Sequence, residues 1–440
     1  MKKKHALIVM LLSFVLVLFT ACIDSSKDSE SKDNGGSDGD KGETIEFWTM
    51  QLKPDFTDFI EGMIADFEEE NPNIKVDWLD VPASDLKDKM ISAVSAGTAP
   101  DLVNLPVGFS HKLVEMDALV NMNDALTDDQ KNQYIEGAWK AYTTEDGETT
   151  FGIPWYLTMD VTMYNTEILK EAGLDADNPP ETFDEAADMG KTIKDKTGKY
   201  GLYPSLDLSM PLQYMTMFNG SIINDEGTKA SFNTPEGLHM FEYFTKLYQD
   251  EIIPHSLITD DQRKGIDIYA SGEAAIFNEG MQFLTQVKAN APDVYENTKV
   301  SPALLSDAGK IGLTTQGLVI PETSEHQDAA VKLAMFITNA KNTVDFAKET
   351  PVFPPVTEAL DDPYFSELPD DPEPIDEARL VGAEQLGHAE SLVNTHGNQE
   401  KVDDLQQAFY DALQKAMLGE KSPKDALEEA ESAFNEILAE

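Results

Sequence analysis

The sequence predicts an α/β fold for the chain beyond residue 43. Short β-prone runs alternate with segments whose apolar residues recur at helical spacing, and strands separated by helices imply parallel pairing in a sheet. The segment 44–440 holds nearly 400 residues, which suits two lobes of ordinary size better than one small domain. No stretch after residue 22 reaches the roughly 18 consecutive apolar residues that a membrane-spanning helix needs.

The first elements follow from apolar spacing and from residues that start or stop helices. We expect, in order, a strand at 45–49, a helix from Pro54 to Phe67, a strand at 74–78, a helix capped by Ser84 and ended by Gly97, and a strand at 101–105. In sheets built this way, ligands bind beyond the carboxyl ends of the strands.

The N-terminus predicts export and a lipid anchor. Three lysines at 2–4 precede an apolar run at 6–19, which has the length of a secretory signal and is short for a bilayer span. The run ends in Leu18-Phe19-Thr20-Ala21-Cys22, which resembles the bacterial lipobox, although Phe19 stands where leucine is usual. Cys22 is the only cysteine, so no intramolecular disulfide can form and acylation would remove a lone thiol. The alternative is an ordinary secretory signal with an incidental cysteine.

Residues 23–43 predict a tether between this anchor and the folded body. The segment is rich in Asp, Ser, Lys and Gly and has no aromatic residue, so it cannot bury enough apolar surface to fold. We therefore expect residues 1–22 to be a signal peptide cleaved before Cys22, and the body to be held at the extracellular face of the cell membrane by the lipid alone.

The charge of the chain excludes one class of partner. There are 81 acidic and 33 basic side chains, a formal net charge of −48. Nucleic-acid binding needs a basic face that neutralises phosphates, so nucleic acid is not an expected partner. A salty habitat would explain the acidity, because salt screens self-repulsion while carboxylates keep the protein soluble. An alkaline habitat is the alternative explanation.

Arginine is nearly absent. The chain has two, Arg263 and Arg379. Sites for carboxylates or phosphates favour the bidentate guanidinium fork. The composition therefore favours a neutral ligand over a uronate or a sugar phosphate, although lysine or backbone amides could also bind an anion.

Six short motifs in order carry a family resemblance. They are Ile45-Glu46-Phe47-Trp48, the turn at 96–101, Gly152-Ile153-Pro154 with Met163-Tyr164-Asn165, Phe218-Asn219-Gly220 with the run at 232–237, the turn at 272–276, and the closing segment at 421–427. Together they resemble the family 1 extracellular solute-binding proteins, which serve carbohydrate importers of the ABC type. The resemblance covers residues 44–440.

The resemblance implies a two-lobed, periplasmic-binding-protein-like α/β fold with a hinge and an interlobe cleft. Lobe 1 would comprise residues 44–157 and 300–342, and lobe 2 residues 158–299 and 343–440. The implied function is capture of a carbohydrate by cleft closure and delivery to an ABC permease and its ATPase. We expect a monomer with no cofactor and no metal.

A sugar site needs aromatic faces for its C–H groups and amides or carboxylates for its hydroxyls. Side chains alternate along a strand, so one of the neighbours Trp155 and Tyr156 should face the cleft. The alternative is that this ring packs under another loop. The candidate ligand-binding residues are Trp48, Gln51, Trp155, Tyr156, Asp160, Asp207, Asn278, Glu279, Met281, Gln316 and Phe353. Tyr164 and Asn165 are expected to be structural.

Two other classes of protein remain open from the sequence. A secreted glycoside hydrolase would also have acidic, aromatic-lined clefts and paired carboxylates. Against an enzyme stands the lack of G-x-S-x-G, H-E-x-x-H and Walker motifs and of a cysteine suited to thiol chemistry. A binding protein for peptides or other solutes would share the two-lobed plan.

The lipid anchor can be tested by replacing its acceptor. Cys22→Ser should leave the body folded and release it from the membrane into the medium, because the thiol that carries the lipid is gone. Fractionation of cells followed by a high-salt wash of the membranes measures this. A variant that stays with the washed membranes would contradict the anchor.

Overall fold

The computed structural model describes residues 42–144, 146–206, 210–259, 262–306, 309–392, 398 and 401–439. Residues 42–440 form one compact unit. The predicted signal peptide, Cys22 and nearly all of the predicted tether lie outside the described residues. Gly42 and Glu43 are exceptions, because the first strand already begins at Glu43.

The first half of the fold follows the predicted order of strands and helices. The elements are β1 (Glu43–Met50), α1 (Thr57–Glu70), β2 (Ile74–Val81), α2 (Ala83–Ala96), β3 (Leu102–Pro106) and α3 (Val107–Val114). Gly97 ends α2 in a left-handed conformation, as expected. The predicted cap is wrong, because Pro82 is the N-cap and the Ser84 hydroxyl donates to Asp85 within the helix.

One mixed sheet runs through the molecule in the order β2-β1-β3-β8-β4-β6-β5. β1 pairs in parallel with β2 and β3, which confirms the expected parallel pairing there. The next strands, β8 (Ile311–Val319) and β4 (Ile153–Asn165), run antiparallel to their neighbours. β5 (Tyr200–Pro204) and β6 (Ala274–Gly280) are again parallel to each other.

The 13-residue strand β4 joins the two ends of this sheet. Its first part, from Ile153 to Met159, pairs with β8, and its second part pairs with β6 from Asp160 onward. The short strand β7 (Thr298–Ser301) pairs with the end of β4 at Thr162–Asn165. β4 therefore changes all of its partners between residues 159 and 162, and two groups of strands share it. The first group is β2, β1, β3 and β8, and the second group is β5, β6 and β7.

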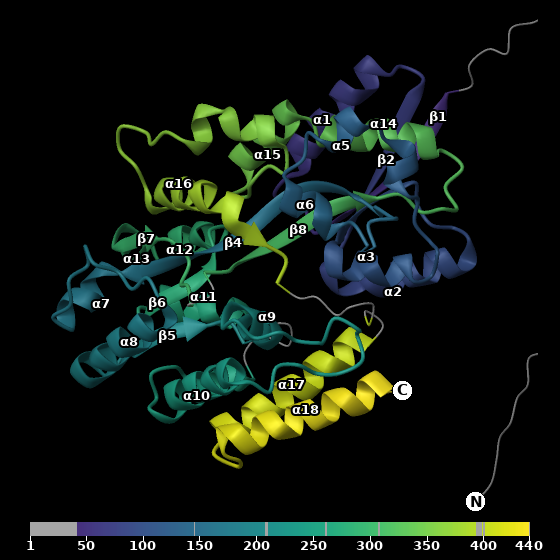
Figure 1. Ribbon diagram of the computed structural model, residues 1–440. Coiled ribbons are helices and arrows are strands. Elements are labelled where there is room, and N and C mark those ends of the chain that lie inside the picture. The colour runs from purple at the N-terminus through teal and green to yellow at the C-terminus, as the bar shows by residue number, and fades with distance from the viewer. Residues whose placement is uncertain are drawn as a thin grey trace, which may run out of the picture. The chain divides into compact units, whose positions relative to one another are not determined.

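Helices cover both faces of the first group of strands (Figure 1). Neighbouring residues of a strand point to opposite faces, and the two core clusters follow this alternation. Phe47 belongs to the cluster that includes residues of α1, α14 (Gln327–Ile337) and α15 (Ala340–Glu349), whereas Trp48 belongs to the cluster with α2 and α3. The result is a three-layer α/β/α arrangement.

Helices α8 (Phe183–Thr197) and α10 (Pro235–Gln249) belong to the second group of elements. α8 lies directly on β5, where a Cβ on Gly201 would lie 2.2 Å from the Cα of Gly190. α10 packs against α17 (Val402–Met417) and α18 (Pro423–Ala439), and α17 also contacts α9 (Met210–Met217). These helices lie together below the sheet in Figure 1.

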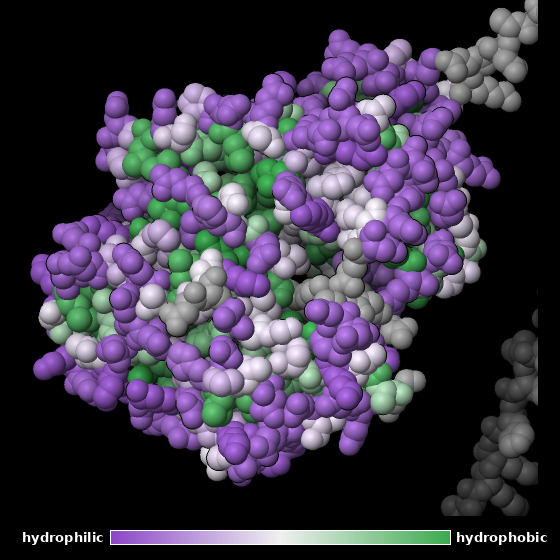
Figure 2. All heavy atoms as spheres, in the orientation of Figure 1, coloured by the Kyte–Doolittle hydropathy of each residue, from purple (hydrophilic) through white to green (hydrophobic). Residues whose placement is uncertain are grey.

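Short elements complete the described chain. They are α4 (Met122–Ala125), α5 (Asp128–Lys131), α6 (Glu136–Ala141), α7 (Thr166–Glu171), η1 (His255–Ile258), α11 (Gln262–Ala270), α12 (Phe283–Asn290), α13 (Pro292–Glu296), η2 (Thr357–Asp361), η3 (Pro363–Phe365), α16 (Pro374–Gln385), η4 (Leu386–His388) and β9 (Ala389–Glu390). The face of the molecule in Figure 2 is dominated by hydrophilic side chains, in keeping with the net charge of −48.

Residues 343–361 pack with the first group of elements, although the predicted lobe 2 resumes at residue 343. The Phe346 ring lies 6.2 Å from that of Phe56 and 5.7 Å from that of Phe59, both at the start of α1. Phe353 forms an antiparallel bridge with Leu157 of β4. These contacts place α15 and η2 beside elements of the predicted lobe 1, and the lobe boundaries stay predictions.

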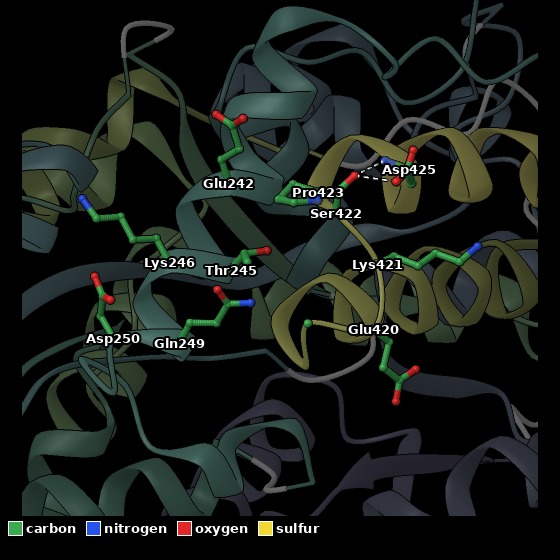
Figure 3. Close-up of a pocket in the computed structure, with 11 residues that line it drawn as sticks. Glu242, Thr245, Lys246, Gln249, Asp250, Glu420, Lys421, Ser422, Pro423 and Asp425 are labelled. Carbon is green, nitrogen blue, oxygen red and sulfur yellow. Dashed lines mark hydrogen bonds between the residues drawn. The ribbon is translucent and has the colours of Figure 1, made fainter.

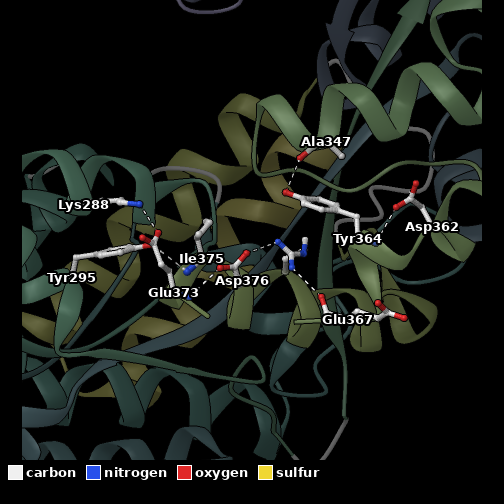
Figure 4. Close-up of polar contacts among 10 residues, drawn as sticks. Lys288, Tyr295, Ala347, Asp362, Tyr364, Glu367, Glu373, Ile375 and Asp376 are labelled. Atoms are coloured by element: carbon white, nitrogen blue, oxygen red, sulfur yellow. Dashed lines mark hydrogen bonds and ion pairs between the residues drawn. The ribbon is translucent and has the colours of Figure 1, made fainter. Parts of the chain in front are cut away.

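Arg379 of α16 contacts Tyr364, Glu367 and Asp376, and these three partners are labelled in Figure 4. Its guanidinium carbon lies 4.0 Å from the centre of the Tyr364 ring, and the Tyr364 hydroxyl donates to the Ala347 carbonyl. Nη1 donates to Asp376 at 2.7 Å and Nη2 to the Glu367 carbonyl at 3.3 Å. This arginine is buried and holds the fold together, so it is not available to a ligand in this structure.

Candidate functional site

A hollow of about 340 Å³ lies between helices that cover the first group of strands and helices of the second group. Its walls come from α2 and α3 on one side, from α9 and the start of α17 on the other, and from the middle of β8. Lys87 of α2 and Asp403 of α17 form an ion pair of 3.1 Å across it. The hollow therefore lies between the two groups of elements that β4 joins.

The side chains in this hollow combine an aromatic ring with groups that form hydrogen bonds. Phe109 and His111 come from α3, Gln213 from α9, Thr314 from β8 and Gln406 from α17. A carbohydrate presents apolar C–H faces and hydroxyls that both donate and accept, so this mixture suits it chemically.

A larger hollow of about 750 Å³ adjoins the first, since His111 and Ser391 line both. It is bounded by α3, α6 and residues 386–391. Its charged side chains are mainly acidic, and Glu136 and Glu390 are two of them. The two hollows are therefore neighbours that meet at His111 and Ser391.

A third hollow, of about 840 Å³, lies between α10 and the turn that joins α17 to α18 (Figure 3). Gln249 spans its floor, where Nε2 donates to the carbonyls of Ala416 and Met417 at 3.4 and 3.5 Å. All of its walls belong to the second group of elements. A movement of the two groups against each other would not close it, so it is a poor candidate for the main site.

Four of the predicted ligand residues with aromatic or apolar side chains are buried in the protein. Met281 and Phe353 are 2% and 0% exposed and belong to the main core cluster. Trp48 is 4% exposed, lies in the α2–α3 cluster and is covered by the Lys89 ammonium at 3.8 Å from the ring centre. These three side chains, like Trp155, present no open face to a ligand in this structure.

Of the two neighbouring rings, one of which was predicted to face the cleft, Trp155 is a core residue in this structure. The ring stacks on Phe346 at 5.1 Å, lies 6.3 Å from Phe47, and is 1% exposed. The packing partner Phe346 comes from α15, nearly 200 residues further along the chain. The alternation rule did hold, because its neighbour Tyr156 is only partly buried.

Three predicted site residues lie together on β4 and β8. Tyr156 and Gln316 are directly paired across the two strands, and both are partly buried. Asp160 follows on the same face of β4, because it lies four residues after Tyr156. Gln51, at the carboxyl end of β1, is exposed.

Asp160 belongs to a polar cluster at the point where β4 changes partners. Asn278 of β6 donates from Nδ2 to Asp160 at 3.3 Å, and its Oδ1 accepts from the Thr162 hydroxyl at 3.1 Å and from the Leu304 amide at 3.2 Å. Burial raises the pKa of Asp160 to about 7. Asn278 is held by these contacts, and Glu279 beside it is 4% exposed.

The remaining predicted residues have different outcomes. Asp207 lies outside the described residues. Tyr164 and Asn165 are structural, as predicted, because Tyr164 is 3% exposed and the Asn165 side chain caps α7 by accepting from the amides of Glu167 and Ile168. No group of three or more His, Cys, Asp or Glu side chains in the described part of the chain could hold a metal ion.

Several residues of the hollow were missed by the sequence analysis. Phe109 and His111 follow the carboxyl end of β3, so the rule that ligands bind at this edge could have identified them. Gln213 lies on α9 among methionines, and no sequence signal shows which side of that helix faces the hollow.

The comparisons with known proteins agree on the class of protein. Residues 53–344 match the family of bacterial extracellular solute-binding proteins. The arabinooligosaccharide-binding protein of Halalkalibacterium halodurans is 25% identical over 344 residues, which are 76% of each chain. The galactooligosaccharide-binding protein of Bacillus subtilis is 24% identical over 454 residues, covering 99% of this chain and 98% of the relative.

A solved structure extends the similarity to the fold. The candidate oligosaccharide periplasmic-binding protein of Synechococcus sp. MITs9220 is 33% identical, with a TM-score of 0.81 over 90% of this chain and 99% of its own. The chain therefore belongs to the bacterial extracellular solute-binding proteins, and the predicted periplasmic-binding-protein-like α/β fold is confirmed. Among the described residues, no helix has the length and apolar character needed to cross a membrane.

Trp155→Ala should destabilise the protein by about 3–5 kcal/mol, because it leaves a cavity between Phe47 and Phe346. Urea unfolding without ligand measures this loss. Ligand affinity, measured at a temperature where the variant is folded, should change little. A variant of normal stability that had lost its affinity would instead identify Trp155 as a ligand contact.

Asp160→Asn should change how stability depends on pH. The unfolded carboxyl has a pKa of about 3.9 and the folded one a pKa of about 7, so the folded state keeps its proton longer. The free energy of unfolding of the wild type should therefore contain a contribution that is present below pH 4 and is lost as the pH rises to 7.

Asparagine keeps an oxygen that accepts from Asn278 and does not titrate. The stability of the variant relative to the wild type should therefore rise between about pH 4 and 7 and stay constant above. Urea unfolding at five pH values between 4 and 8 tests this. Parallel curves for the two proteins would show that burial does not perturb Asp160.

Proposed function

We propose that this protein captures a carbohydrate in the groove between α3 and the helices α9 and α17, and delivers it to an ABC importer. The observation that carries the proposal is the polar and aromatic lining of a hollow that lies between the two groups of elements joined by β4. Relatives that match this chain are named as binding proteins for arabino- and galacto-oligosaccharides, which supports this class of ligand.

Cleft closure is the proposed mechanism. β4 is the strand that both groups of elements share, so a small change of its backbone near residues 159–162 would move one group against the other. A ligand shifts such an equilibrium only if it binds the closed state better than the open one. Contacts with α3 on one side and Gln213 on the other would provide that difference.

The lobes that this mechanism needs are those predicted, with one change. Lobe 1 would comprise residues 44–157 and 300 to about 361, because α15 and η2 pack with the first group of elements. Lobe 2 would comprise residues 158–299 and the remainder of the chain to residue 440. The hinge would then be the middle of β4 together with the two further crossings of the chain, near residue 300 and near residues 362–374.

We propose that the ligand is neutral and is an oligosaccharide. The groove adjoins a second hollow, since both are lined by His111 and Ser391. The guanidinium of Arg379 is occupied by Asp376 and by the Glu367 carbonyl, which leaves it unable to bind an acidic sugar. Binding without chemical change is proposed, so turnover of a bound sugar would contradict this function.

The proposed setting is the outer face of the cell membrane, with the body held there by a lipid on Cys22 and acting as a monomer. Family membership supports an extracellular position. The net charge of −48 supports a salty surrounding, because dissolved ions screen the repulsion among surface carboxylates.

Calorimetric titration of residues 23–440 against a sugar panel tests the function. The panel contains neutral arabino-, galacto- and malto-oligosaccharides, with oligogalacturonides and tripeptides as the acidic and the non-sugar arms. We expect a neutral oligosaccharide to bind most tightly. Binding of a tripeptide alone would contradict the carbohydrate class, and preference for the oligogalacturonide would contradict neutrality.

Gln213→Ala should lower the affinity for the preferred sugar about tenfold, because it removes an amide that can both donate to and accept from a hydroxyl. Gln249→Ala is the matched control. It removes the same group from the hollow beside α10 and should leave the affinity unchanged. An equal loss in both variants would argue against the groove as the binding site.

A further inference from the structure

The backbone of Gln51, the first residue after β1, has an unusual conformation. Its φ is +55°, in the left-handed region that side chains other than glycine rarely adopt. Among the described residues, the other non-glycine positions with positive φ are Asp117, Asn219 and Glu251. Each of these three follows the end of a helix, where a left-handed residue commonly terminates the hydrogen-bonding pattern. Gln51 follows a strand, so helix termination does not explain it.

Asp80, near the end of β2, holds the chain on both sides of Gln51. Its Oδ1 accepts from the Thr49 hydroxyl at 2.7 Å and from the Leu52 amide at 2.9 Å, and its Oδ2 accepts from the Lys53 amide at 3.0 Å. One carboxylate thus fixes the residues before and after the strained position. Hydrogen bonds to a carboxylate are stronger than those between neutral groups.

The parallel pairing brings this loop to the edge of the groove. Phe47 pairs with Leu102 and Trp48 with Val103, so Gln51 and Pro106 each lie three residues beyond the last pair of this ladder, at the same edge of the sheet. Adjacent strands are about 4.8 Å apart. The residues directly after Pro106, from Val107 to Phe109, line the smaller hollow. The Gln51 side chain is exposed at this edge.

A strained backbone persists where its surroundings hold it, and such positions are concentrated at ligand sites. We propose that Asp80 is a positioning residue for ligand binding, which holds the loop after β1 so that the Gln51 amide contacts the bound sugar. This inference rests on the proposed function. It assigns a role to Asp80, whose carboxylate is directed to the loop and not to the ligand.

The experiment is a double-mutant cycle on the two residues. The proteins are the wild type, Gln51→Gly, Asp80→Asn and the double variant, with Asp77→Asn as control because Asp77 is exposed on the same strand. Calorimetry with the preferred oligosaccharide of the panel gives the dissociation constant, and thermal unfolding without sugar gives Tm.

Gln51→Gly should raise Tm, because glycine adopts positive φ without strain, and it should weaken sugar binding about tenfold. Asp80→Asn places an amide donor against backbone donors, so it should weaken binding to a similar extent while Gln51 is still present. The double variant should bind no more weakly than Gln51→Gly alone, because Asp80 acts through Gln51. Asp77→Asn should match the wild type.

A purely structural role would give a different pattern. Asp80→Asn would then lower Tm with an unchanged dissociation constant, and Gln51→Gly would raise Tm with an unchanged dissociation constant; either result overturns the inference. If Asp80→Asn fails to fold, Asp80→Glu, which keeps the carboxylate and displaces it by one methylene, takes its place in the cycle. If the wild type binds no sugar of the panel, the proposed function itself is rejected. If the wild type binds a sugar and the variants follow the structural pattern, the inference alone fails.

Discussion

The change of partners along β4 is the constraint on which the rest of the structure depends. The strand pairs with β8 up to Met159 and with β6 from Asp160, so two groups of strands share one backbone. Each group has its own helices, and the groove lies where helices from the two groups face each other. A strand of ordinary length could pair with only one of the two groups. With 13 residues, β4 is long enough to pair with both.

The first and second parts of β4 are held by different kinds of contact. Around Trp155 the contacts are between aromatic rings whose centres lie 5.1–6.3 Å apart, which form an apolar core with α15. Around Asp160 they are hydrogen bonds to Asn278 in a partly buried polar cluster. Packed rings resist displacement, whereas hydrogen bonds can be exchanged for bonds to water at small net cost. The position where β4 changes partners is thus the one where apolar packing gives way to polar contacts.

Local patterns predicted the fold well, whereas none of the predicted ligand residues lines the two hollows beside α3. Apolar spacing and the stop at Gly97 were enough for β1 to β3 and for α1 and α2, because these signals act over a few residues. Trp155 was expected at the ligand because alternation says that neighbouring rings face opposite ways, but not which ring faces in. Phe346 decides that, from a helix far along the chain. Gln213 was missed for the same reason, since its orientation depends on how α9 packs against α17.

The ion pair between Lys87 and Asp403 has a consequence for the rate at which a ligand enters. It crosses the smaller hollow, so a ligand arriving from that side has to part the two side chains. Their exposed fractions are 48% and 60%, and ion pairs so well solvated are worth only about 0–1 kcal/mol. Breaking the pair would slow entry about fivefold at most. A ligand that entered the hollow past this ion pair would therefore meet only a weak barrier there, since thermal motion is enough to separate the two side chains.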